Sequence, residues 1–331
     1  MSDSYRRGAM NLEGHQHAFF FRFLREKATR LSLQRAVAIC FLVFASLSAR
    51  PLHAQMDPYF TAVNTPVPKG NLMLMLLPDY QLAHTGPNFL TYMGMAEYGI
   101  TSRWTAGFMA EGQKIGGLPA TFGGLRFNTY FQLFPHDRLL HLTLYGEYED
   151  VNQAALYKME ISGFGASDLT LPLAVARRAP AHTLEQRIIT YHDWGRLDVT
   201  FNFISETGLQ NYNNNFGYVW GIFRQPAWNS MGNMGRQMKM PSRATPALVS
   251  GQRLGYGLEM TGASGNNTQF GFHWPRQQQY LGPVLTYALS PHWSFRLEPE
   301  FGLSAVSDPF VLRTGVTYTI NNFFHRMAGS L

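Results

Sequence analysis

Apolar and polar residues alternate with a period of two over much of the chain, most regularly in residues 293–305. One face of this stretch is apolar and comprises Trp293, Phe295, Leu297, Pro299, Phe301, Leu303 and Ala305. The other face comprises Ser294, Arg296, Glu298, Glu300, Gly302 and Ser304. Successive side chains of a strand point to opposite sides of a sheet, so the stretch predicts a strand with one apolar and one polar face. Its thirteen residues are long for a soluble strand and enough to cross a bilayer at a tilt, which favours the wall of a transmembrane barrel.

The same kind of pattern recurs along the chain and gives thirteen candidate strands. They are residues 70–77, 89–98, 104–111, 125–133, 140–149, 186–193, 197–206, 216–223, 254–261, 268–274, 281–289, 293–305 and 310–320. The repetition predicts an all-β fold, because each strand puts apolar residues on one side and polar residues on the other. A soluble β-sandwich is the rival fold, and it would need a partner surface to cover the apolar stripe.

The number of strands follows from where the tight turns lie. A single-chain bacterial barrel has an even number of antiparallel strands and keeps its short turns and both termini on the periplasmic side. The tight turns are at residues 99–103, 135–138, 195 and 290–292. With these on one side, two or four spans fit between Glu206 and Tyr280. We therefore expect residues 216–223 in an extracellular loop and a barrel of about twelve strands, with ten or fourteen as alternatives.

The N-terminal part of the chain has the organisation of a secretory signal peptide. Residues 36–49 form an apolar run of 14 residues that follows several basic residues and precedes Ala54. This predicts a signal peptide over residues 1–54, cleaved after Ala54. Residues 1–54 carry eight Lys and Arg against three Asp and Glu, so they account for five of the six net positive charges. The remainder is close to neutral, which argues against nucleic acid as a partner.

The rest of the chain divides into three expected parts. The Pro-rich residues 55–69 predict a periplasmic lead-in, residues 70–320 the barrel, and residues 321–331 a C-terminal tail. The longer irregular regions, residues 150–184 and 208–252, are expected to be surface loops that narrow or gate the barrel. No apolar run reaches 18 residues, which excludes a helical membrane protein. The only cysteine, Cys40, lies in the signal peptide, so the mature chain offers no disulfide or cysteine metal site.

The last strand carries a short motif at Arg313, Gly315, Tyr318 and Ile320. A polar residue, a glycine two positions later and hydrophobic residues three and five after that resemble the terminal assembly signal of outer-membrane β-barrel proteins. The resemblance is porin-like or transporter-like and indicates no specific family. It implies the bacterial outer membrane, its lipid and the barrel-assembly machinery as location and partners. The chain departs from the pattern in continuing to Leu331, where related proteins end on an aromatic residue.

Three tryptophans, Trp104, Trp194 and Trp293, each lie in or beside one of the tight turns. Indole favours the membrane interface, so they are expected to form one girdle. The alternative is that they belong to an ordinary core.

The polar face of the strands supplies the candidate solute-lining residues. They are Arg126, His141, Glu147, Glu149, Asp198, Arg296, Glu298, Glu300 and Arg313. One interpretation is a polar lumen that conducts or binds a small solute, so that the protein is a passive channel or transporter. The other is a plugged, salt-bridged interior with a structural or copper-related role. Twelve strands enclose a narrow space, which leaves both open.

The sequence offers weaker signals for copper binding and for enzymatic activity. Thioethers suit Cu(I), and Met231, Met234, Met238 and Met240 lie within ten residues, although a flexible loop in a Met-rich chain explains them equally simply. No nucleophile elbow, metal-binding helix motif or phosphate loop occurs. The neighbours His192 and Asp193 would point to opposite faces of a strand. We therefore expect no enzyme and no cofactor, with an outer-membrane hydrolase as the alternative.

Overall fold

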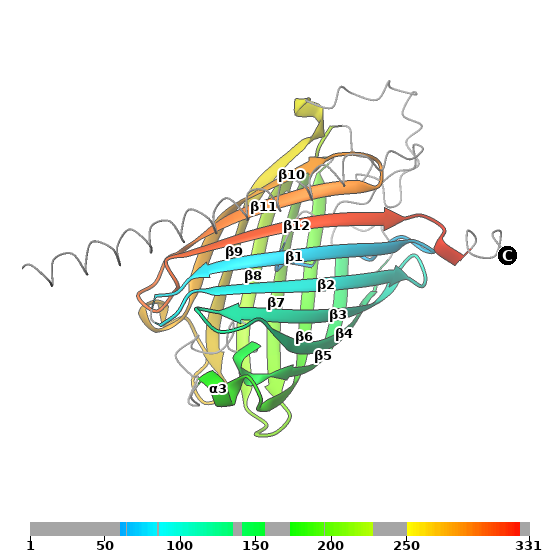
Figure 1. The fold of residues 1–331 in the computed structure, drawn as a ribbon. Coiled ribbons are helices and arrows are strands. Elements are labelled where there is room, and N and C mark those ends of the chain that lie inside the picture. The colour runs from blue at the N-terminus through cyan, green and yellow to red at the C-terminus, as the bar shows by residue number, and fades with distance from the viewer. Residues whose placement is uncertain are drawn as a thin grey trace, which may run out of the picture. The chain divides into compact units, whose positions relative to one another are not determined.

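Twelve antiparallel strands form one closed barrel (Figure 1). This computed structural model describes residues 60–63, 65–84, 86–134, 141–155, 173–194, 196–227 and 250–324. Each strand pairs with its neighbours in sequence, and β12 pairs with β1 to complete the ring. The predicted all-β fold with about twelve strands is therefore confirmed.

The strands are β1 (Leu72–Leu82), β2 (Phe89–Gly99), β3 (Trp104–Ile115), β4 (Thr121–Gln132), β5 (His141–Asn152), β6 (Pro180–Trp194), β7 (Leu197–Gly208), β8 (Asn214–Arg224), β9 (Leu254–Asn266), β10 (Gln279–Ala288), β11 (Trp293–Gly302) and β12 (Phe310–Ile320). Short helical turns lie between strands. They are α3 (Leu173–Ala176), η3 (Gly251–Arg253) and η4 (Trp274–Arg276). Among the residues described, no helix is long and apolar enough to cross a membrane.

The alternation seen in the sequence corresponds to the two faces of the barrel wall. In β11, the outward Phe301 is 50% exposed, whereas the inward Glu300 beside it is fully buried. Closing the sheet leaves no unpaired strand edge, and an apolar exterior can face lipid. These two properties are those of a bacterial outer-membrane barrel, and its outer surface contacts the membrane lipid.

One of the twelve strands is not the one that the sequence predicted. Residues 216–223, expected in an extracellular loop, belong to β8, which pairs along its length with β7 and β9. Residues 268–274, expected to be a strand, lie in the β9–β10 connection and make one isolated bridge, Gly265 with Phe270. Only two of the three candidate strands between Glu206 and Tyr280 fitted the positions of the tight turns, and the prediction excluded the wrong one. The inward residues Val219 and Phe223 of β8 are apolar, so this strand lacks a charged inner face.

The two expected surface loops also lie at opposite ends of the barrel. Strands alternate in direction, so the β5–β6 connection lies at the end that holds the β1–β2 and β3–β4 turns. The β8–β9 connection lies at the other end, with the short β2–β3 and β10–β11 turns. Residues 208–252 are therefore not one loop, because β8 crosses the wall within them.

The backbone of β8 approaches Gly257 of β9 closely, and a substitution at Gly257 tests this packing. A Cβ at this position of β9 would lie 2.2 Å from the carbonyl oxygen of Ile222 and 2.7 Å from the Cα of Phe223. We expect Gly257→Ala to lower the free energy of unfolding by about 1–3 kcal/mol, because backbone atoms must move. Gly146→Ala is the control, since a Cβ there meets nothing within 4 Å. Heat-modifiable gel mobility and urea unfolding in vesicles measure both, and equal stability of the two variants would contradict the packing.

Candidate functional site: the barrel lumen

The structure places all nine predicted lumen residues on the inward face of the wall. Eight are buried, namely Arg126, His141, Glu147, Glu149, Arg296, Glu298, Glu300 and Arg313. Asp198 is half-buried near the end of the barrel, where the amide of Gln225 donates a hydrogen bond to its carboxylate. The solute-lining role of these residues stays a prediction.

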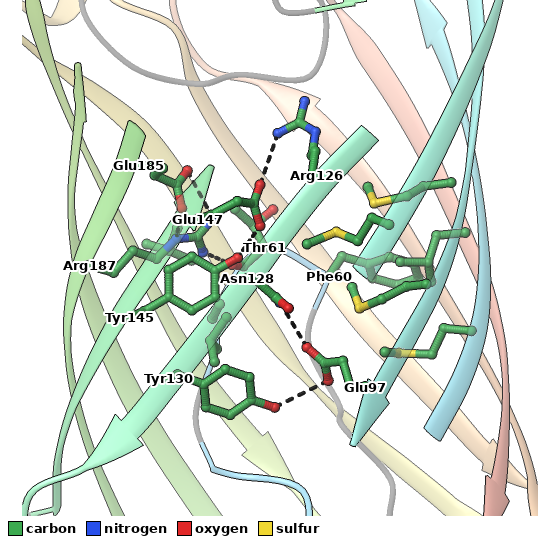
Figure 2. A pocket seen from close by; sticks show the side chains of 18 of the residues that line it. Phe60, Thr61, Glu97, Arg126, Asn128, Tyr130, Tyr145, Glu147, Glu185 and Arg187 are labelled. Carbon is green, nitrogen blue, oxygen red and sulfur yellow. Dashed lines mark hydrogen bonds and ion pairs between the residues drawn. The ribbon is translucent and has the colours of Figure 1, made fainter. Parts of the chain in front are cut away.

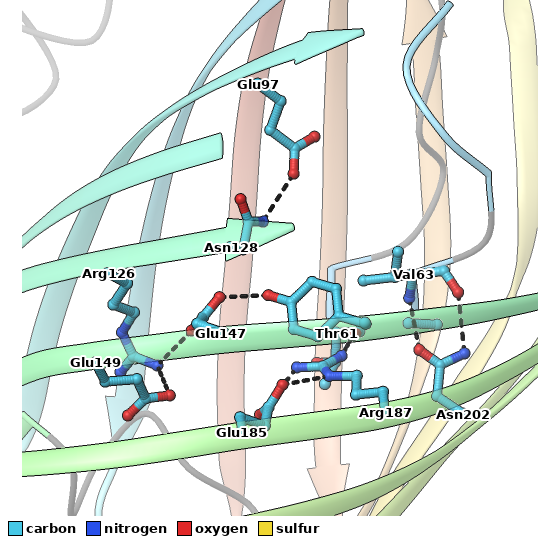
Figure 3. Close-up of polar contacts among 12 residues, drawn as sticks. Thr61, Val63, Glu97, Arg126, Asn128, Glu147, Glu149, Glu185, Arg187 and Asn202 are labelled. Carbon is cyan, nitrogen blue, oxygen red and sulfur yellow. Dashed lines mark hydrogen bonds and ion pairs between the residues drawn. The ribbon is translucent and has the colours of Figure 1, made fainter. Parts of the chain in front are cut away.

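Arg126 of β4 holds together three carboxylates from the neighbouring strands. Its Nε lies 2.9 Å from Glu111 of β3, and its Nη1 lies 3.2 Å from Glu147 and 2.7 Å from Glu149 of β5 (Figure 3). All four side chains are at most 5% exposed. Such a buried group is stable only when its charges are paired and hydrogen-bonded.

A second cluster lies on β5 and β6, next to the first. The Nε of Arg187 is 2.5 Å from Glu185, and its guanidinium lies 5.1 Å from the centre of the Tyr145 ring. The Tyr145 hydroxyl donates a hydrogen bond to Glu147, which joins the two clusters (Figure 2).

Arg313 forms a third group on the opposite wall. Its Nε is 3.1 Å from Glu300 of β11 and 3.7 Å from Asp79 of β1. The interior therefore contains ion pairs on several strands, and much of its charge is compensated within the wall.

Residues 60–63 lie inside the barrel, which corrects the expectation of a periplasmic lead-in for this part of residues 55–69. The backbone N–H groups of Phe60, Thr61 and Ala62 donate to the carboxylate of Glu259 at 2.8–2.9 Å. Val63 donates its N–H to Asn202 Oδ1 at 2.8 Å and accepts from Asn202 Nδ2 at 3.0 Å (Figure 3). Nothing in the sequence predicts this placement, because the donors are backbone groups, which leave no signature in residue type.

The segment enters from the end of the barrel that holds the start of β1. Val67 is buried there and donates its N–H to Thr105 Oγ1 at 2.8 Å. Further inside, Arg187 donates to the carbonyl of Thr61, and Arg313 donates to its hydroxyl. The segment therefore contacts several sides of the wall and narrows the lumen.

A cavity of about 140 Å³ remains beside the segment (Figure 2). One side of it is a wall of methionines that the sequence analysis did not identify. They are Met73 and Met75 of β1, Met93 and Met95 of β2, and Met109 of β3. A signal was available, since these residues share the parity of the inward Asp79, Glu97 and Glu111 in the same strands.

Acidic groups outnumber basic groups on the inward faces of the described strands. Eleven carboxylates point inward, namely Asp79, Glu97, Glu111, Glu147, Glu149, Glu185, Asp198, Glu206, Glu259, Glu298 and Glu300. Four guanidinium groups oppose them, on Arg126, Arg187, Arg296 and Arg313. Carboxylates therefore outnumber the guanidinium groups that can neutralise them on these faces.

The remaining predicted residues lie on the outside or at the ends. Trp104, Trp194 and Trp293 lie at the barrel end of the short β2–β3, β6–β7 and β10–β11 turns, and Trp194 is 61% exposed. Of the expected assembly signal, Arg313 and Gly315 face inward and Tyr318 and Ile320 outward. Their roles in membrane anchoring and assembly stay predictions.

The described residues contain no group of three or more His, Cys, Asp or Glu positioned to hold a metal ion. The proposed copper ligands Met231, Met234, Met238 and Met240 lie outside the described residues.

Comparisons with known proteins give distant structural similarity alone. No protein-family model and no curated protein matches the chain. Among solved structures, an outer-membrane channel from Pseudomonas putida F1 shares 11% identity and a TM-score of 0.48 over 80% of this chain and all of that one. The KdgM porin shares 9% identity and a TM-score of 0.41, and the match covers 75% of this chain and 99% of that one. The translocator domain of the autotransporter NalP from Neisseria meningitidis shares 8% sequence identity and a TM-score of 0.39. The match covers 88% of this chain and 97% of that one.

We predict that loss of the Arg126 guanidinium, the cation of this cluster, strongly lowers the stability of the barrel. Arg126→Leu would leave Glu111, Glu147 and Glu149 buried without it, so we expect the free energy of unfolding to fall by about 3–5 kcal/mol. Arg224→Leu, at an exposed position at the end of β8, is the control and should cost less than about 0.5 kcal/mol. Urea unfolding in phospholipid vesicles measures both. A loss for Arg126→Leu no larger than for the control would show that the cluster is not stabilising.

Proposed function

We propose that the protein is a passive outer-membrane channel for a small solute and that it admits cations more readily than anions. The observation that supports this is the excess of inward carboxylates over guanidinium groups around a cavity within a closed barrel. A low-dielectric wall focuses the field of such charges along the lumen. That the chain has no enzymatic activity and no cofactor stays a prediction.

The position of residues 60–63 inside the barrel is evidence for a narrow pore. The N–H groups of this segment are held by Glu259 and Asn202, and the segment reaches the middle of the strands. The same contacts favour the second candidate function, a structural barrel with a closed lumen. Conductance separates the two, because a closed barrel passes no current.

The first test is single-channel recording of the purified mature protein in a planar bilayer. We expect discrete, small current steps with a reversal potential that indicates cation preference. Glu298→Gln and Glu300→Gln each replace one inward carboxyl group with an amide and should reduce cation selectivity by a measurable shift of the reversal potential. Lys114→Gln is the control, since Lys114 is exposed on β3. A silent bilayer with correctly folded barrel would refute the channel.

The second test concerns the segment itself. Deletion of residues 55–67 should raise the conductance at least about two-fold, because the lumen widens. Glu259→Ala removes the acceptor of three backbone hydrogen bonds and should raise the conductance in the same direction.

Thr261→Ala is the matched control. Thr261 is buried two residues further along β9 and lines the same cavity, and its hydroxyl makes no hydrogen bond to the described residues of the segment. Wild-type conductance in the deletion variant would show that the segment does not restrict the pore.

A further inference from the structure

We infer that the cavity beside Phe60 is a binding site for an organic cation with an apolar body, such as an aryl ammonium ion. The inference rests on the proposed function and names the class of solute that the lumen selects. It is carried by three features of the cavity, which are its methionine wall, its carboxylates and a guanidinium group already seated against it.

The methionine wall is continuous across three strands. Met75 of β1 lies directly opposite Met95 of β2, and Met95 lies directly opposite Met109 of β3. Directly opposite residues have Cβ atoms about 4.5–5.5 Å apart, so these side chains form one apolar surface. Flexible, polarisable thioethers adapt to ligands of different shapes.

Carboxylates border this surface on the same inward face. Glu97 is directly opposite Met73, and Glu111 is directly opposite Met93. Glu97 accepts hydrogen bonds from the Asn128 amide at 3.0 Å and the Tyr130 hydroxyl at 3.2 Å, both neutral donors. These donors fix the position of the carboxylate beside the methionines without adding positive charge.

The chain itself places a delocalised cation in this environment. The Arg296 guanidinium lies 4.9 Å from the centre of the Phe60 ring, and its Nη2 donates to Met75 Sδ at 3.2 Å. An aromatic face and a thioether therefore accommodate a cation here, as expected from cation–π attraction. A cationic ligand can take the same position.

A ligand that displaces the Arg296 guanidinium would move it towards a nearby carboxylate. Glu298 lies two positions from Arg296 on the same inward face, is fully buried, and neither carboxylate oxygen accepts a hydrogen bond from the described residues. Pairing of Arg296 with Glu298 would offset the cost of moving it off Phe60.

The cavity is large enough for one aromatic ring. Its volume is about 140 Å³, and apolar cavities of about 150 Å³ bind benzene. Benzylammonium is therefore a suitable probe, with benzyl alcohol as a neutral molecule of the same shape and benzoate as an anion.

Isothermal titration of the folded mature protein in detergent tests the inference. We expect benzylammonium to bind at least about tenfold more tightly than benzyl alcohol, and benzoate not to bind. Glu97→Gln should weaken benzylammonium about tenfold and leave benzyl alcohol unchanged. Glu206→Gln is the control, because Glu206 is inward and buried but does not line the cavity, and it should change the affinity less than about two-fold.

The methionine wall is tested at Met95. Met95→Leu keeps an apolar side chain of similar volume and should retain the affinity, whereas Met95→Gln places an amide on the wall and should weaken binding several-fold. Equal affinity for benzylammonium and benzyl alcohol, or equal effects of Glu97→Gln and Glu206→Gln, would overturn the inference and leave the methionines as packing for Phe60 and Val67. Binding is measured without conduction, so a silent bilayer with intact binding would refute only the channel, and conduction without binding only the cation site.

Discussion

Pairing of every backbone N–H and C=O group is the constraint on which the rest of this structure depends, because an unpaired group in hydrocarbon costs several kcal/mol. The contact between β1 and β12 satisfies it, from Leu72 opposite Ile320 to Leu82 opposite Phe310. Once the sheet is closed, successive side chains of each strand face lipid and the interior in turn. The charged residues of the strands are therefore concentrated in a narrow space, and the interior has to be arranged to tolerate them.

That arrangement uses both side chains and backbone. Glu185 lies directly opposite Glu147 on one side and Glu206 on the other, a register that destabilises a sheet unless cations intervene. Arg187 and Arg126 supply positive charge at this point. On β9, Glu259 is stabilised by three backbone N–H donors of the inserted segment, which act on a carboxylate more strongly than on a neutral acceptor. The segment is thus part of the electrostatic balance of the interior as well as an obstacle in it.

The alternation of residues predicted the fold class, the number of strands and the inward direction of all nine proposed lumen residues, because burial of one face leaves a direct mark on sequence. It did not decide which two of the three candidate strands between Glu206 and Tyr280 cross the wall. Val219 and Phe223 of β8 pack with Ala62 of the inserted segment, so the inner face of this strand carries no charged residue that would have favoured it over residues 268–274. The segment itself was unpredictable from residue type, since Glu259 and Asn202 hold it through its backbone.

The cavity beside the inserted segment is lined on one side mainly by thioethers and on another side by ion pairs. The methionines of β1–β3 lie with Phe60 and Val67, whereas the ion pairs around Arg126 and Arg187 lie on β3–β6. A purely hydrophilic solute gains little from the first side, and a purely apolar one must displace water from carboxylates on the second. A molecule that carries an apolar group and a positive charge can satisfy both sides at once. The proposed selectivity therefore rests on the pairing of thioethers with carboxylates in one cavity, more than on net charge alone.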